Sequence, residues 1–273
     1  MSYSIFSSTM VDMAWPEIEK AVQNGAIVLL PTGVIEEHGP HMTLGVDTYL
    51  SYQACSNIKC QLDSFGIKAL ITPPFYWGMN NATGSFPGSF TVRKETMKAL
   101  LYDILLSLKR WGVTYVFNIN WHDDFQHCNA LLEAIKEARI ETGIRAYSVI
   151  SDILGKRLGL TGKESHVLLY NFPFPEGTPP KYLDIHAGSG ETGIMAHYFP
   201  KLVDKDVART LTPTNLTMEE FAIWRLGWYD ALKLTPSGYL GNPADFNIEE
   251  GKVYMETLSK VVAALIKDFL DAV

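Results

Sequence analysis

The chain has 273 residues, 47% of them hydrophobic and 19% charged, so it can bury a large core and is not a disordered polymer. Its formal net charge of −7 argues against non-specific binding of nucleic acid, which needs a basic face. No apolar run reaches the ~18–20 residues that span a bilayer, and the N-terminus lacks the pattern of a signal peptide. Cys55, Cys60 and Cys128 form no C-x-x-C pair and predict free thiols in a reducing compartment, so we expect a cytoplasmic protein.

Short apolar runs alternate with segments of helical spacing through the first half of the chain. Residues 26–30, for example, form a continuous apolar run that ends at Pro31-Thr32-Gly33, as is typical of a buried parallel strand. The pattern predicts strands over 26–30, 68–72, 113–119 and 144–150, and helices over 10–23, 47–64, 93–111 and 125–142. Because strand and helix alternate, we expect an α/β fold with three layers, α/β/α, and a mainly parallel central sheet.

The second half of the chain is less regular. Residues 156–181 are rich in proline and predict a surface excursion or a lid beside a site. Further helices are expected over 191–198, 218–232 and 251–272. The sequence contains no internal repeat and no low-complexity linker, so we expect a single domain over residues 1–273.

The first candidate site follows the first predicted strand. In extended backbone, residues two apart point to the same side, so Glu36 and His38 should project together and Glu37 should point away. A turn rich in glycine and proline can then fold Asp47 back to the start of the next helix. Ligands of open parallel sheets bind beyond the carboxyl ends of the strands, which is where these side chains lie.

Two further clusters occupy equivalent positions. His122 and Asp124 follow the third predicted strand and have the same two-residue spacing. His186 and Glu191 lie in the segment 184–192, at the start of a predicted helix. A parallel sheet would bring such strand ends to one edge, so we expect these side chains to meet.

Each of these residues also has a purely structural explanation. Asp47 could cap a helix, Asp184 could cap a turn, and Glu191 could lie favourably near a helix N-terminus. The combination favours a functional site, because two pairs of alternating carboxylate and histidine each follow a buried strand.

Convergence of Glu36, Asp47 and Asp124 would require a cation, or else protonation of a carboxylate. Like charges ~5 Å apart repel by roughly 3 kcal/mol per pair at an effective dielectric constant of about 20. Two divalent cations would neutralise the three carboxylates and one hydroxide. A mixture of histidine and carboxylate ligands without thiolate suits Zn, Mn, Fe or Co.

The same segments resemble motifs of the creatininase (creatinine amidohydrolase) family. The resemblance extends over residues 26–251, nearly the whole chain, and its first motif is quite specific. The matching segments are Glu36-Glu37-His38-Gly39-Pro40-His41 with Asp47, Asn120-Trp121-His122, His186 to Thr192, Phe86-Pro87-Gly88, and Gly238, Gly241 and Pro243 with Glu250-Gly251.

The resemblance implies a creatininase-like three-layer fold, two divalent metal ions per chain (Zn, Mn or Fe), and a homo-oligomer that is often a hexamer. Carried over by position, Glu36, Asp47 and His122 would hold one metal ion. His38, Asp47 and Asp124 would hold the other, so that Asp47 bridges the two ions.

The resemblance also implies roles outside the metal ligands. His186 would be the proton-transfer group, and Glu191 would be its partner or an additional metal ligand. Several features depart from the family pattern, among them Ala82-Thr83, where many members carry Glu-His before Phe-Pro-Gly. Asp124 stands where the creatininases have a longer Glu, and Tyr182 lies in a stretch where the creatininases have tryptophans and this chain has none. Tyr182 is therefore the candidate substrate-binding residue, and creatinine itself is a doubtful substrate.

The leading hypothesis is a metal-dependent amidohydrolase that cleaves the C–N bond of an amide, a cyclic amide or a formamide. A metal-bound hydroxide would attack the carbonyl carbon, and His186 would protonate the leaving nitrogen. One alternative is the hydrolytic C–C ring opening of a cyclic polyol ketone of the inosose type. Another is a non-catalytic metal-binding protein, against which the complete ligand set argues. The expected partners are a small-molecule substrate and further copies of the chain, without nucleic acid or membrane.

Overall fold

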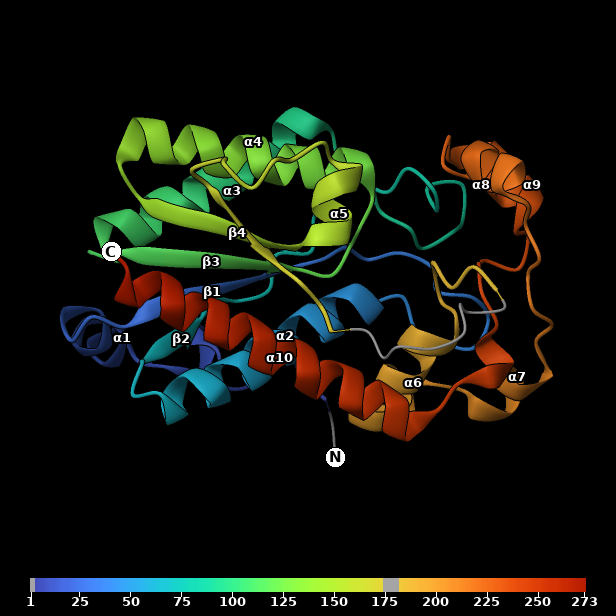
Figure 1. Cartoon of the computed structure of the whole chain (residues 1–273), viewed down its shortest axis with the longest axis horizontal. Helices are drawn as coiled ribbons and strands as arrows, with labels where there is room; N and C mark the ends of the chain where they lie inside the picture. The colour runs from blue at the N-terminus through green and yellow to red at the C-terminus, as the bar shows by residue number, and fades with distance from the viewer. Residues whose placement is uncertain (1–2, 174–181) are drawn as a thin grey trace.

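Three layers make up the protein, with a parallel sheet between two sets of helices, as expected (Figure 1). The computed structural model describes residues 3–173 and 182–273. Within them, no helix is both long enough and apolar enough to cross a membrane.

The central sheet has five strands in the order β2-β1-β3-β4-β5, and every neighbouring pair is parallel. Its central strand β3 pairs with β1 so that Asn120 lies opposite Thr32 at the carboxyl ends. The strands are β1 (Ile27–Thr32), β2 (Ala69–Ile71), β3 (Tyr115–Asn120), β4 (Arg145–Ser151) and β5 (Val167–Tyr170).

Alternate residues of the strands face the two helical layers, as the two-residue period of a strand requires. Leu29 belongs to the core beneath one layer, whereas Val28 and Leu30 belong to the core beneath the other. The first layer is formed by α2 (Val46–Ser64), α6 (Ser189–Tyr198) and α10 (Ile248–Asp271). The second is formed by α1 (Trp15–Gln23), α3 (Lys94–Arg110) and α4 (Phe125–Thr142).

Short helices complete the described chain. They are η1 (Met10–Asp12), α5 (Asp152–Arg157), η2 (Pro200–Leu202), α7 (Lys205–Thr210), α8 (Met218–Trp224), α9 (Trp228–Leu234) and η3 (Pro243–Asp245).

Three sequence-based expectations differ from the structure. The helix predicted over 10–23 is the 3-10 helix η1 and the separate helix α1, because Met13 and Ala14 between them are extended. The excursion predicted over 156–181 contains strand β5, whose pairing with β4 could not be inferred from its short apolar run; part of this excursion, 174–181, lies outside the described residues. The helix predicted over 218–232 is two helices, α8 and α9, because Gly227 adopts φ +83° and ψ −168° between them. L residues rarely adopt that conformation, so the helix cannot continue through it.

Close contact between α6 and α10 depends on two glycines. A Cβ on Gly251 would lie 2.3 Å from the carbonyl carbon of Gly193, and a Cβ on Gly193 would lie 2.5 Å from the carbonyl oxygen of Asn247. The contact fixes the start of α6, which carries Glu191, against the long helix α10. It also gives Gly251, part of one matching motif, a packing role.

Candidate metal centre

The candidate site lies at the carboxyl ends of β1 and β3, at the point where the strand order reverses. In an open parallel sheet this is the expected position of a ligand-binding crevice. Glu36 and His38 lie on the segment that follows β1, and His122 lies just after β3. The pairing of Thr32 with Asn120 therefore brings these two segments together.

Asp47 reaches the same place because α2 begins very close to the end of β1. A Cβ on Gly33 would lie 2.8 Å from the backbone carbonyl of Asp47, so only glycine allows this approach. The backbone N–H of Glu36 donates to the carbonyl of Leu44 at 3.0 Å and closes the intervening loop. As the glycine-rich turn predicts, the start of α2 is folded back onto the strand end.

Glu36, Asp47 and His122 form the first group that could hold a metal ion, with ligand atoms within 4.8 Å of one another. His122 Nδ1 lies 2.9 Å from Glu36 Oε1 and 3.1 Å from Asp47 Oδ2. All three residues are buried. This is the trio that the family resemblance implies for one metal ion.

His38, Asp47 and Glu191 form a second group of the same kind, and it shares Asp47 with the first. His38 Nε2 lies 3.4 Å from Asp47 Oδ1 and 3.8 Å from Glu191 Oε2. One oxygen of Asp47 thus faces each group. The arrangement is that of a carboxylate able to bridge two cations.

Both histidines are oriented by backbone carbonyls on their far sides. His122 Nε2 donates to the carbonyl of Met79 at 3.0 Å, and His38 Nδ1 donates to the carbonyl of Glu36 at 3.2 Å. When neutral, each ring therefore presents its other nitrogen, without a hydrogen, to the carboxylates. This is the usual arrangement around histidines that bind metals.

Two buried atoms at the shared position have no hydrogen-bond partner: His38 Nε2 and Asp47 Oδ2. When the histidines are neutral, as metal binding requires, both atoms are acceptors without a donor, and an unpaired buried acceptor costs about 1–3 kcal/mol. Divalent cations, one in each group, would satisfy both atoms together with the surrounding carboxylates. The residues present therefore fit divalent metal ions of the kind that binds histidine and carboxylate.

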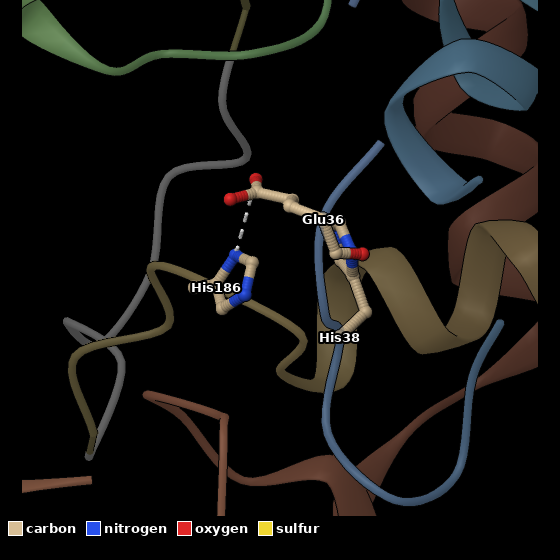
Figure 2. A group of neighbouring side chains, drawn as sticks. All are labelled: Glu36, His38 and His186. Carbon is tan, nitrogen blue, oxygen red and sulfur yellow. Dashed lines mark hydrogen bonds and ion pairs between the residues drawn. The ribbon is translucent and has the colours of Figure 1, made fainter. Parts of the chain in front are cut away.

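His186 lies beside this centre on the segment that leads into α6, whereas Glu36 and His38 come from the segment after β1 (Figure 2). Its Nε2 donates to the carbonyl oxygen of Glu37 at 2.8 Å and lies 3.3 Å from Glu37 Oε1. Its Nδ1 lies 4.0 Å from Glu36 Oε1, so this nitrogen faces the carboxylate group. With Glu36 and His38 it forms a third set of potential ligands.

The electrostatics of the site favour positive charge. Burial lowers the pKa of His186, but the carboxylates of Glu36, Glu37 and Glu191 outweigh it and raise that pKa to about 10. Burial likewise opposes protonation of His122, yet its neighbouring carboxylates raise its pKa well above the usual value. Protons are therefore held where the carboxylates gather, and cations would compete for the same place.

Asp124 does not join the predicted second metal group. Its Oδ1 accepts from the backbone N–H groups of Gln126 and His127, at 2.9 and 3.1 Å, and caps α4. Its Oδ2 accepts from the N–H of Asn81 at 3.1 Å. Asp124 has a short side chain at the start of a helix, where capping of the backbone N–H groups competes with metal binding. Glu191 lies beside His38 and Asp47, in the place expected for Asp124.

Three other predictions have mixed outcomes. Asp184 caps α6, as its structural explanation proposed, by accepting from the N–H groups of Ser189 and Gly190 at 2.9 and 2.8 Å. Glu191 accepts from the N–H of Ala187 at 2.7 Å and belongs to the second metal group, and its charge also helps to raise the pKa of His186. Tyr182 is half-buried and is absent from the described residues that line the site's cavity.

Sequence reasoning missed the role of Glu37. The two-residue strand period predicted that its side chain would point away, but the backbone after β1 is not extended strand. Glu37 is buried, accepts from the N–H of Gly39 at 2.9 Å, and is the partner of His186. Thr83 was also missed; its hydroxyl donates to Glu36 Oε2.

Similarity to known proteins agrees with this geometry. Residues 11–266 match the family model described as creatininase, creatinine amidohydrolase. The chain belongs to the creatininase family. Creatinine amidohydrolase of Pseudomonas putida is 25% identical over 98% of both chains. A mycofactocin precursor peptide peptidase of Mycobacterium ulcerans is 23% identical over 96% of this chain and 89% of that one.

Solved creatininases share the fold. A mutant creatininase of zinc–zinc type has a TM-score of 0.71 at 22% identity, over 98% of both chains. A manganese creatininase has a TM-score of 0.69 at 21% identity, over 96% of this chain and 98% of that one. This member of the creatininase family is therefore a metal-dependent hydrolase of the amidohydrolase type.

Proposed function

We propose that the protein hydrolyses an amide C–N bond at a centre of two divalent ions, Zn, Mn or Fe, that share Asp47. The supporting observation is the position of Asp47, which turns one oxygen toward His122 and the other toward His38. Glu36 and His122 complete one set of ligands, and His38 and Glu191 complete the other. When bound, such ions supply a water of lowered pKa and polarise the carbonyl oxygen.

In this proposal His186 delivers the proton that the leaving nitrogen needs. His186 Nε2–H donates to the carbonyl oxygen of Glu37 and keeps its hydrogen. The proton is therefore gained and lost at Nδ1, which faces the carboxylate of Glu36. Hydrolysis adds a hydroxyl group to the acyl carbon, breaks the C–N bond and places a proton on nitrogen. Protonated His186 supplies that proton and regains one from the attacking water.

The substrate would occupy a cavity of about 660 Å³ beside the centre. Glu36, Asp47, His122 and His186 line one part of it, and an aromatic wall lines another. That wall contains Trp121, Phe172 and Tyr254, in which the rings of Phe172 and Tyr254 stack with centroids 4.5 Å apart. The volume is within the range of sites for small ligands.

A substrate screen with the metal-loaded protein tests this proposal. Candidate substrates are creatinine, linear amides, formamides, short peptides and a cyclic polyol ketone, each assayed for new amine, new carboxylate and ring opening by mass spectrometry. Release of amine and carboxylate in equal amounts would support amide hydrolysis. Ring opening of the ketone without amine release would favour the C–C alternative, and turnover of no compound by fully loaded protein would favour a metal-binding role.

A matched variant assigns the proton step. His186→Ala removes the proton donor but none of the residues of the two proposed metal groups, so turnover should fall by roughly 10²–10⁴-fold with metal content unchanged. Loss of metal together with turnover would make His186 a ligand, and unchanged turnover would move the proton step to another group. We also propose, from the family resemblance, a cytoplasmic homo-oligomer, a hexamer in particular. Light scattering tests the assembly.

A further inference from the structure

His127 lies behind the centre, on α4, and neither metal group includes it. Its ring is fully buried and packs edge-to-face against the ring of His122, with centroids 5.0 Å apart and planes at 82°. A histidine in this position must satisfy both ring nitrogens within the protein.

The hydrogen bonds of His127 enclose His122 from two sides. On one side, His127 Nδ1 accepts from the backbone N–H of Met79 at 3.3 Å, and the carbonyl of Met79 accepts from His122 Nε2 at 3.0 Å. On the other side, His127 Nε2 donates to Asn120 Oδ1 at 3.1 Å, and Asn120 Nδ2 donates to the carbonyl of His122 at 2.5 Å. The ring and the backbone of His122 are thus each held through one intermediate residue.

The neighbouring backbone is shaped to admit this ring. A Cβ on Gly78 would lie only 2.3 Å from His127 Nδ1, so a larger residue at this position would push the ring away from Met79. Glycine at position 78 is therefore what allows the Met79 backbone to lie between the two histidines.

We propose that His127 is a positioning residue of the metal centre, which holds His122 with Nδ1 toward Glu36 and Asp47. It touches no proposed ligand atom; it acts by fixing Met79 and Asn120. Groups that orient metal-binding histidines in this way usually change metal affinity by about 10–100-fold when they are removed. The inference rests on the proposed metal centre.

Three variants separate the two arms of this network. His127→Phe preserves the ring and removes both hydrogen bonds. His127→Asn retains an oxygen near the Nδ1 position for Met79, and His127→Gln retains a nitrogen near the Nε2 position for Asn120. As a control for the loss of a buried hydrogen bond elsewhere, Thr235→Val removes the acceptor of Trp224 Nε1, 2.9 Å away.

The measurement is titration of metal-free protein with Co²⁺ alone, followed by calorimetry and by the visible absorption bands of the bound ion. For His127→Phe we expect the affinity at one of the two sites to fall by about 10–100-fold with altered absorption bands. The single-arm variants should lose less, and Thr235→Val should lower the melting temperature without changing affinity. If His127→Phe does not fold, the comparison rests on the other two.

Wild-type affinity and absorption bands in the folded variants, with only the melting temperature lowered, would overturn the proposal and leave His127 as a core residue. If the wild-type protein binds no Co²⁺, the proposed metal centre itself fails. That result is distinguishable, because it precedes any comparison of variants.

Discussion

At the scale of single residues, the side chain that completes the second metal group decides how the centre is built. Glu191 reaches His38 and Asp47 from the start of α6, whereas both oxygens of Asp124 are engaged by backbone N–H groups. From the sequence alone both residues are equally suitable metal ligands, since each is a carboxylate near a predicted strand or helix end. The packing of α6 against α10 helps to bring Glu191 to the centre.

Substitution of Glu191 and substitution of Asp124, made separately, therefore have opposite expected effects on metal content. Glu191→Gln should reduce the metal content of reconstituted protein from about two ions to about one, because it removes one anionic ligand. Asp124→Ala should keep both ions and lower the free energy of unfolding by about 0.5–2 kcal/mol, the usual cost of losing an N-cap. Elemental analysis and urea denaturation check the pair. Loss of metal from Asp124→Ala, with full content in Glu191→Gln, would restore the ligand set implied by the resemblance.

Glu37 should control the pH dependence of turnover through His186. A proton donor must be protonated, so activity should fall as the pH rises through the pKa of His186, which nearby carboxylates raise to about 10. A bound cation lowers this pKa, but removal of the Glu37 charge lowers it further in either state. In Glu37→Gln the alkaline limb of kcat should therefore move to lower pH. An unmoved limb in an active variant would show that another group titrates there.

At the scale of elements, the α8–α9 corner holds the loop that carries Thr83. The backbone N–H of Trp228 donates to the carbonyl of Asn81 at 2.7 Å, and Asn81 Nδ2 donates to the carbonyl of Leu226 at 2.9 Å. A Cβ on Gly227 would lie 2.3 Å from the same Asn81 carbonyl oxygen. The corner therefore needs glycine for its conformation and for its contact.

Gly227→Ala should lower the free energy of unfolding by about 2–4 kcal/mol, because it adds a clash to backbone strain. Gly66→Ala is the matched control, since Gly66 has φ +80° and no atom within 4 Å of an added Cβ. The control should cost about 1 kcal/mol, from strain alone. Equal losses of unfolding free energy in the two variants, measured by urea denaturation, would mean that the clash with Asn81 adds nothing to the backbone strain.

Alternating strands and helices were predictable from sequence because their apolar runs match the buried faces of a parallel sheet. The four predicted strands correspond to β1 through β4, within a few residues at their ends. Strand β5 was missed because Val167–Tyr170 is short and is followed by a proline-rich stretch.

The site was harder to predict than the fold. Glu36, His38, Asp47 and His122 follow from their places at the strand ends, but the roles of Glu37 and His127 depend on loop geometry that no sequence motif indicates.

At the scale of the whole molecule, protons and metal ions should compete for the same side chains, and either one should stabilise the folded protein. A histidine whose folded pKa is raised contributes stability that is full below the unfolded pKa of about 6.5 and is lost as the pH rises through the folded value. His122 and His186 are of this kind in the metal-free protein. Metal ligands must be deprotonated, so metal-induced stabilisation should grow with pH.

The expected result is a larger increase in melting temperature on adding Mn²⁺ at pH 8.5 than at pH 6, reversed by a chelator. Differential scanning fluorimetry at fixed ionic strength measures it, with Asp47→Ala as the control that should show no increase at either pH. A shift that is independent of pH would mean that the ions bind away from the histidines.

The proposed function depends most directly on two ions that share the carboxylate of Asp47. The decisive measurement is the metal content of protein stripped by a chelator, reloaded with Zn²⁺ or Mn²⁺ and freed of excess ion, for wild type and Asp47→Ala. We expect about two ions per chain in the wild type, and almost none in Asp47→Ala with its far-ultraviolet circular dichroism unchanged. A wild type that saturates at one ion, together with an Asp47→Ala variant that retains it, would contradict a shared centre.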